Sequence, residues 1–122
     1  MTQENKELLL KDLCARTPYG VKAQYMNSIF VIDYVSPMYG EVKLDTPDNW
    51  TVGVSEVKPY LFPLSSMTEK QKKEYQYITE RWMYDPSYSI SDSTDWLNKN
   101  HFDYRGLIEK GLAIDATGLN IY

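Results

Sequence analysis

The stretch that decides the fold is residues 20–35, GVKAQYMNSIFVIDYV. Apolar and polar side chains alternate in its first half, and a period of two residues is typical of a strand with one buried face. The second half is apolar at nearly every position, which favours a strand covered on both faces. The pair Asn27-Ser28 between the halves predicts a turn. Together these features predict two antiparallel strands joined as a hairpin.

Two further turn signals extend the hairpin into a meander. They are Pro37-Met38-Tyr39-Gly40 and Thr46-Pro47-Asp48-Asn49, and they leave short strands near residues 20–26, 29–35, 41–45 and 51–58. Because twisted strands curl, a meander of four to five short strands within residues 19–64 is expected to form a small barrel or a strongly bent sheet. The prolines of residues 58–64 predict an extended crossing segment rather than a central strand.

A helix is predicted ahead of the sheet, over residues 5–16. Its apolar residues recur at intervals of three and four, and the pair Thr17-Pro18 ends it. The single cysteine, Cys14, belongs to this apolar stripe, beside Leu10 and Leu13. Because a lone cysteine cannot form a disulfide within the chain, we interpret Cys14 as a small core residue rather than a nucleophile.

A second helix is predicted over residues 68–84. Thr68 and Gln71 have the spacing of a capping box, in which each residue bonds the backbone of the other at the start of a helix. The residues expected on the buried stripe of this helix are Tyr75, Ile78 and Trp82.

The remainder of the chain is predicted to be a loop over residues 85–93 and a C-terminal helical segment over residues 94–122. Within that segment, residues 94–100 form one short helix, and Asp103 caps another over residues 104–110. Residues 1–122 are therefore expected to form a single α+β domain. It would have an N-terminal helix, a curled antiparallel sheet and two to three C-terminal helices.

Size and composition limit the class of protein. The chain has 122 residues, 43% hydrophobic and 14% aromatic, which is enough for one sizeable core. Its apolar runs are far shorter than the roughly 20 residues that cross a bilayer, and the first seven residues, MTQENKE, lack an export-signal pattern. We therefore expect a soluble, cytoplasmic protein without a membrane partner. The net charge of −4 argues against generic nucleic-acid binding, which depends on clustered Lys and Arg.

The clearest compositional signal is the presence of 11 tyrosines. Tyrosine is enriched where protein surfaces meet, so we expect an aromatic face on the sheet that grips an extended peptide or stacks nucleic-acid bases. The candidate binding residues are Phe30, Tyr34, Tyr39, Trp50 and Tyr60. The alternative is that these rings fill the core. Clustering of Lys22, Lys43 and Lys58 around the face would favour nucleic acid, and acidic or neutral surroundings would favour protein.

An enzymatic alternative depends on the only histidine. His101, Asp103 and Arg105 occupy alternate positions, so on a strand they would share one face. Such a set could perform acid–base chemistry on a phosphodiester or nucleotide, with the guanidinium holding the oxyanion. The favoured interpretation is structural, with Asp103 as a helix cap and Arg105 in an ion pair. Because metal, nucleotide and acyl-transfer motifs are missing from the sequence, we expect no metal ion and no cofactor.

Three stretches resemble a known family. They are residues 12–21 (DLCARTPYGV), 58–69 (KPYLFPLSSMTE) and 95–113 (DWLNKNHFDYRGLIEKGLA). Through them the chain is similar to a family of small uncharacterised proteins of gut anaerobic bacteria and their phages, which have no known activity. The resemblance implies a cytoplasmic accessory protein carried by a phage or mobile element, and it implies no catalytic or binding residue.

Three functions are left open at this point. The leading hypothesis is a non-enzymatic interaction module that binds another macromolecule, preferably a protein, through the aromatic face. The alternatives are a small phosphodiester- or nucleotide-acting hydrolase that uses His101, Asp103 and Arg105, and a small barrel that binds nucleic acid. The apolar tail, residues 119–122, could also pack on a second copy of the chain and form a homodimer.

Overall fold

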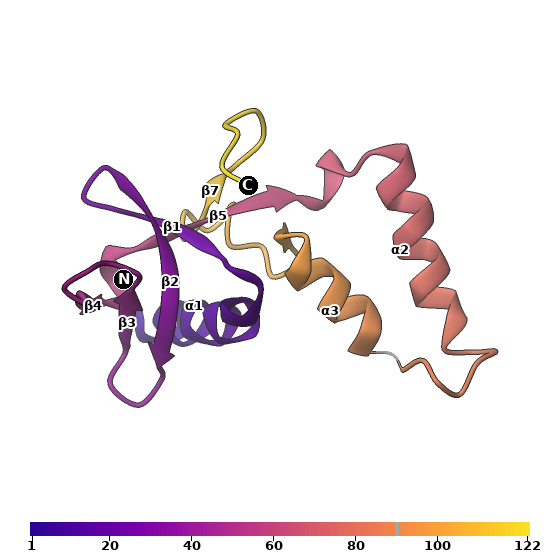
Figure 1. Cartoon of the computed structure of the whole chain (residues 1–122), viewed down its shortest axis with the longest axis horizontal. Coiled ribbons are helices and arrows are strands. Elements are labelled where there is room, and N and C mark those ends of the chain that lie inside the picture. Colours follow the sequence, from indigo (N-terminus) through magenta and orange to yellow (C-terminus); the bar gives the residue numbers. More distant parts are fainter. Residues whose placement is uncertain (90) are drawn as a thin grey trace.

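The computed structural model describes residues 1–89 and 91–122 and shows the α+β class that the sequence predicts. Helix α1 (Gln3–Arg16) precedes a mixed sheet, and helices α2 (Glu69–Arg81) and α3 (Ser91–Lys99) follow most of it. Figure 1 shows the sheet and α1 on one side of the molecule and α2 on the other.

The start of α2 follows the local signal in the sequence. Thr68 Oγ1 accepts the backbone N–H of Gln71, and Gln71 Oε1 accepts the backbone N–H of Thr68, so the predicted capping box is confirmed. The last part of the predicted loop 85–93 is instead the first turn of α3, which begins at Ser91. Ile90, which belongs to that predicted loop, lies outside the described residues.

Seven strands form one sheet in the described part of the chain. They are β1 (Lys22–Tyr25), β2 (Ser28–Ser36), β3 (Glu41–Leu44), β4 (Thr51–Gly53), β5 (Lys58–Pro63), β6 (Phe102–Asp103) and β7 (Ile114–Asp115). Their order is β4-β3-β2-β1-β5-β6, with β7 also paired to β5. Neighbours from β4 to β5 are antiparallel, and β6 and β7 run parallel to β5. The predicted meander is confirmed in β1 to β4, but the sheet is not closed into a barrel.

Strand β5 corrects the prediction that residues 58–64 form a crossing segment. It pairs with three other strands and so lies inside the sheet. The C=O of Leu61 accepts the N–H of Ala116, whereas the N–H of Phe62 donates to the C=O of His101. Because the C=O and N–H of one trans peptide point in opposite directions, these partners lie on opposite edges of β5. Strands β1 and β6 therefore lie along the same edge of β5, and β7 lies along the other edge.

The two prolines of β5 fit the sheet because of this arrangement. Backbone groups alternate between the two edges of a strand, so Pro59 and Pro63 direct their nitrogen atoms to the same edge as Leu61. That edge is paired with β7 only at Tyr60 and Leu61. The missing N–H groups therefore cost no hydrogen bond with a neighbouring strand.

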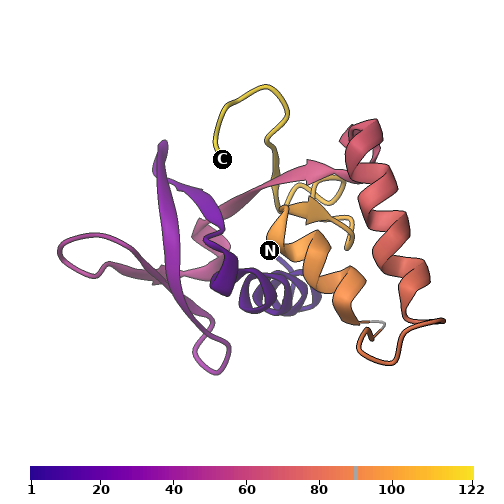
Figure 2. The same ribbon diagram turned by 45° about the vertical axis from the view of Figure 1, so that its right-hand side comes forward.

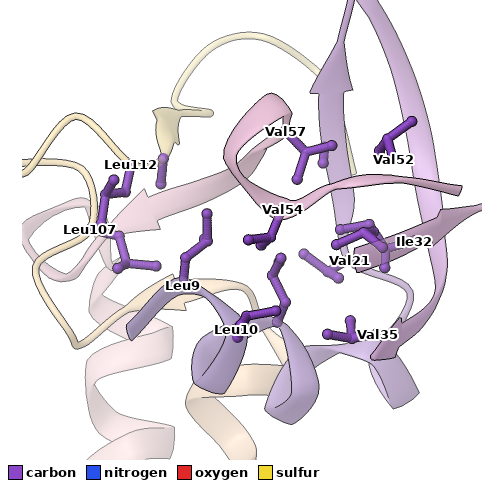
Figure 3. Packing of buried hydrophobic residues seen from close by; sticks show 14 of the residues in the cluster. Leu9, Leu10, Val21, Ile32, Val35, Val52, Val54, Val57, Leu107 and Leu112 are labelled. Atoms are coloured by element: carbon purple, nitrogen blue, oxygen red, sulfur yellow. The ribbon is translucent and has the colours of Figure 1, made fainter. Parts of the chain in front are cut away.

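The main core lies between α1 and the inner face of the sheet (Figure 3). Leu9 and Leu10 of α1 point toward buried valine and isoleucine side chains of the sheet and of the turn before β5. The labelled partners are Val21, Ile32, Val35, Val52, Val54 and Val57. Leu107 and Leu112 complete this core from the C-terminal segment. Each such side chain stabilises the fold by about 1.5–3 kcal/mol when fully buried, so this core holds α1 against the sheet.

A second, smaller core joins α2 and α3 to the end of the sheet. Trp96 of α3 stacks on Phe102 of β6 with ring centroids 5.7 Å apart, and Leu97 is buried beside them. Tyr75 and Ile78 of α2 are only partly buried against this cluster. Figures 1 and 2 both show α3 between α2 and the rest of the molecule. Helix α2 is therefore the outermost element and has no fully buried side chain.

Three local predictions are wrong. Trp82 is 45% exposed rather than buried, because α2 ends at Arg81 and Trp82 lies beyond its packed face. Cys14 is exposed on α1, since it lies about 100° around the helix from the buried Leu13. Residues 104–110 form turns instead of a helix, so two α-helices follow β5 in the described chain, the lower number of the predicted two to three.

Candidate interaction surface

A β-bulge in β2 decides which of the predicted aromatic residues share a face. The pairing of β2 with β3 shifts by one residue between Ile32 and Tyr34, so Asp33 is an extra residue. Because side chains alternate across a strand, one extra residue moves every later side chain to the opposite face. Phe30 and Ile32 therefore face the core before the bulge, and Val35 faces it afterwards. Tyr34 is left on the outer face, 60% exposed.

The outer face of the sheet carries a hollow beside Tyr34, which we call the outer hollow. Its volume is about 310 Å³, and its lining residues are Tyr34, Ser36, Tyr39, Glu41, Lys43 and Thr51. Tyr39, in the turn between β2 and β3, is 72% exposed. Neither tyrosine takes part in any ring contact among the described residues. Both rings are therefore free to contact a guest.

The strands that carry the outer hollow belong to an acidic segment of the chain. Residues 28–57, which include β2, β3 and β4, hold five Asp and Glu residues, with Lys43 as their only basic residue. The rest of the chain holds equal numbers of basic and acidic residues, so the net charge of −4 belongs to this segment. Lys43 Nζ lies 3.6 Å from Asp33 Oδ2. Glu41 takes part in no ion pair of the described residues.

Of the three lysines that could have marked a nucleic-acid face, only Lys43 lines the outer hollow. Lys22 Nζ donates to the C=O of Ile121 at 2.7 Å and is thereby engaged by the tail. Lys58 is exposed at the start of β5. The surroundings of the outer hollow thus meet the condition that favours a protein partner.

The other three predicted binding residues are not part of the outer hollow. Phe30 and Trp50 contact each other, with ring centroids 5.8 Å apart. Phe30 packs partly buried against the main core, and Trp50 is 45% exposed. Tyr60 is buried in β5. Of the five predicted binding residues, the structure therefore brings only Tyr34 and Tyr39 to the outer hollow.

Ser36, Glu41 and Thr51 line the outer hollow but were not selected from the sequence. A signal for Glu41 was present, because Glu41 and Lys43 flank the buried Val42 and such alternation places both on the outer face. No local signal identified Thr51, which reaches the hollow through the pairing of β4 with β3.

His101, the centre of the enzymatic alternative, is buried just after α3. It follows α3 in the left-handed region, with a φ of 62°, and its side chain is buried. Its ring stacks on Tyr122 with centroids 3.6 Å apart and planes at 11°. Burial, and then the positive charges of Arg16 and Lys22, lower the pKa of His101 to about 4. The imidazole is therefore uncharged and covered at neutral pH.

Asp103 organises the turn that follows β6. Its carboxylate accepts the backbone N–H groups of Arg105, Leu107 and Ile108 at 2.9–3.2 Å. No hydrogen bond joins Asp103 to His101 in the described part of the chain. The two residues therefore do not form the His–Asp pair on which the hydrolase hypothesis depends.

Arg105 belongs to a buried ionic cluster that ties this turn to α1. Its Nε donates to Asp12 Oδ1 at 3.1 Å, and Asp12 Oδ2 accepts from Arg16 Nε at 2.8 Å. Arg16 is fully buried and also donates to the C=O of Phe102 at 2.7 Å. Tyr104 lies under both guanidinium groups. The i,i+4 spacing of Asp12 and Arg16 was the only sequence signal for this cluster.

Tyr122, the last residue of the sequence, fills a gap along one edge of β5. On that edge β1 pairs as far as Pro59 and β6 begins at Phe62. Between them, the Tyr122 hydroxyl accepts the N–H of Lys22 and donates to the C=O of Tyr60, each at 2.8 Å. Burial raises the pKa of Tyr122 to about 12. The tail is thus held by its own chain, and packing on a second copy stays a prediction.

Neither a metal site nor a membrane span is found in residues 1–89 and 91–122. No group of three or more His, Cys, Asp or Glu is placed to hold a metal ion, and no helix combines the length and apolar character needed to cross a bilayer. Comparison with protein-family models, with curated proteins and with solved structures gave no match for this chain.

Proposed function

We propose that this chain is a non-enzymatic interaction module that binds a protein partner at the outer hollow. The observation that carries the proposal is the exposure of Tyr34 and Tyr39, 60% and 72%, on a hollow of about 310 Å³. A tyrosine ring offers a large contact area and loses little side-chain entropy on binding. These two rings pack on no other ring of the described chain, so their apolar area is available to a partner.

Shape and charge support insertion of a partner side chain. The volume of the outer hollow is at the lower end of ligand pockets, which span roughly 300–1,000 Å³. The edge strand β4 has only three residues, so it offers little backbone for the addition of a partner strand. The acidic character of residues 28–57 repels phosphate groups, which supports a protein rather than a nucleic acid.

No observation on the described residues favours either alternative function. A hydrolase would need an accessible His101, and this side chain is buried under Tyr122. A nucleic-acid-binding barrel would need a basic face, and the outer hollow is lined by one acidic and one basic side chain. The accessory role, the cytoplasmic location and the phage or mobile-element origin stay predictions.

The proposal is tested by affinity capture with the double variant Tyr34→Ser/Tyr39→Ser. Tagged wild type and variant are incubated with lysate of the cells that produce the protein, with and without nuclease treatment, and bound proteins are identified by mass spectrometry. The matched control is Tyr77→Ser/Tyr84→Ser, which removes two exposed tyrosines (53% and 82%) from the end of α2 and beyond it.

A protein retained by wild type and control but lost by the Tyr34/Tyr39 variant is the expected result. With the purified partner, calorimetry should then give binding at least about tenfold weaker for that variant, as for loss of an interface hot spot. A partner retained equally by all three proteins contradicts the proposal. Binding that survives only without nuclease would favour the nucleic-acid alternative instead.

A further inference from the structure

The outer hollow has the composition of a site for a positively charged side chain. The face of an aromatic ring is negative, so it attracts an ammonium or guanidinium group that lies within about 6 Å of the ring centre. Tyr34 and Tyr39 offer two such rings on one hollow, and no cation of the described chain lies over either of them.

The charged groups beside the rings favour the same ligand. Glu41 is exposed, lines the hollow and has no ion-pair partner in the described chain. Lys43 lines the same hollow, but its Nζ lies 3.6 Å from Asp33 Oδ2, so the carboxylate of Asp33 offsets the charge of Lys43. The side chains of Glu41, Lys43 and Asp33 together carry one negative charge at neutral pH. A ligand with one positive charge would neutralise the site.

The position of Lys43 has a consequence for affinity. The register of β2 with β3 sets Lys43 directly opposite Tyr34, so its charge opposes any second cation that enters. The ion pair with Asp33 is exposed, 36% and 54% for the two side chains, and such pairs are weak and mobile. Lys43 can therefore move aside at little cost, and its charge lowers the affinity of the site rather than closing it.

We infer that the outer hollow takes one lysine or arginine side chain of the protein partner. The Tyr34 and Tyr39 rings contact the methylene stem and the charged head, and Glu41 supplies the counter-charge. This inference rests on the proposed function, because it names the chemical group by which the partner is recognised. A neutral apolar side chain would use the rings alone, and an acidic side chain would be repelled by Glu41.

The test uses three short peptides and the full-length ¹⁵N-labelled protein. The peptides are acetyl-Ser-Gly-Xaa-Gly-Ser-amide, in which Xaa is lysine, norleucine or glutamate; norleucine has the same kind of stem without the charge. Titrations are followed by the backbone amide shifts of Ser36, Glu41 and Thr51. Lysine should bind about two- to fivefold more tightly than norleucine for each ring that contacts the charge, and glutamate should not bind.

Two variants separate a local charge effect from a general one. Glu41→Gln should weaken lysine binding by about two- to fivefold, whereas Glu74→Gln, an equal charge change on the exposed face of α2, should leave it unchanged. Lys43→Gln should raise the affinity for the lysine peptide, relative to that for the norleucine peptide, by a similar factor. This gain is not expected if Lys43 merely helps to build the hollow.

The outcomes also distinguish this inference from the proposed function. Equal binding of lysine and norleucine, or equal effects of Glu41→Gln and Glu74→Gln, would overturn the cation inference. Failure of all three peptides to shift the three amides would overturn it as well. In each case the outer hollow still stands as the partner site if capture of the partner depends on Tyr34 and Tyr39. Capture that is independent of both tyrosines would overturn the two proposals together.

Discussion

Removal of one hydroxyl group, by Tyr122→Phe, tests how the sheet is held together at β5. In the wild type this hydroxyl takes the place of a direct hydrogen bond between Lys22 of β1 and Tyr60 of β5, because it accepts the N–H of Lys22 and donates to the C=O of Tyr60. Phenylalanine keeps the ring that stacks on His101 and lies 6.0 Å from the ring of Phe62. The variant therefore removes these two hydrogen bonds and the longer, 3.4 Å contact of the hydroxyl with the C=O of Lys22.

The expected loss follows from the burial of the two backbone groups. Lys22 is partly exposed, so water can replace its partner, and the loss there is about 1 kcal/mol or less. Tyr60 is 5% exposed, so its C=O is left without a partner at a cost of about 1–3 kcal/mol. We expect the free energy of unfolding to fall by about 2 kcal/mol in total. For a chain of this length, that is a fall in Tm of roughly 6–12 °C.

The assay is urea unfolding of wild type, Tyr122→Phe and a control, Tyr84→Phe, at neutral and alkaline pH. Tyr84 is 82% exposed, so its variant should change stability by less than about 0.5 kcal/mol. The raised pKa of Tyr122, about 12 against about 10 when unfolded, adds a second signature. The folded state holds the hydroxyl proton more tightly than the unfolded state does. The contribution of the protonated hydroxyl to stability is therefore present below about pH 10 and is lost as the pH rises toward 12.

Tyr122→Phe should lack this alkaline loss of stability. The residue as a whole is 41% exposed, so the loss in wild type will be smaller than the pKa difference alone implies. If Tyr122→Phe unfolds at the same urea concentration as wild type and Tyr84→Phe, the hydroxyl does not bridge the two strands and the reasoning is refuted.

Two further predictions concern the buried side chains of His101 and Asp12. His101→Asn keeps a residue that tolerates the left-handed backbone but removes a group whose pKa is lowered to about 4, and the unfolded imidazole takes up its proton near pH 6.5. As the pH falls from about 6.5 to 4, the free energy of unfolding measured in urea should therefore fall more steeply for wild type than for His101→Asn. Equal pH dependence in the two proteins would contradict the burial of neutral His101. Asp12→Ala should lower the free energy of unfolding by about 3–5 kcal/mol, because it leaves Arg16 fully buried without its carboxylate. Asp12→Leu combined with Arg16→Met should lose less in thermal unfolding than Asp12→Ala alone; a larger loss would show that the ion pair itself stabilises the fold.

The elements that sequence predicted well have short-range signals. Helix α1 follows from the recurrence of leucines, the start of α2 from the capping box of Thr68 and Gln71, and β1 to β4 from alternation and turn residues. Each signal involves residues within four positions of one another, so no tertiary contact is needed to detect it. The same approach failed for residues 104–110, where Asp103 accepts backbone N–H groups of a turn instead of capping a helix.

The candidate site was predicted in part. Tyr34 and Tyr39 are two of the five aromatic residues that the sequence suggests for a binding face, and both line the outer hollow. Phe30 was placed with Tyr34 because four residues separate them, which on a regular strand means one face. The bulge at Asp33 breaks that rule, and nothing in the local sequence marks it.

By itself, then, the sequence determined the α+β class, the antiparallel meander and the excess of acidic residues between 28 and 57. These follow from the order of side chains along the chain and from their charge. Only the tertiary structure decided that β5 lies inside the sheet, that Tyr34 faces outward and that Tyr122 bridges β1 and β5. Each of these depends on hydrogen bonds between segments far apart in the sequence, and such pairings are selected by the packing of the whole core rather than by local preference.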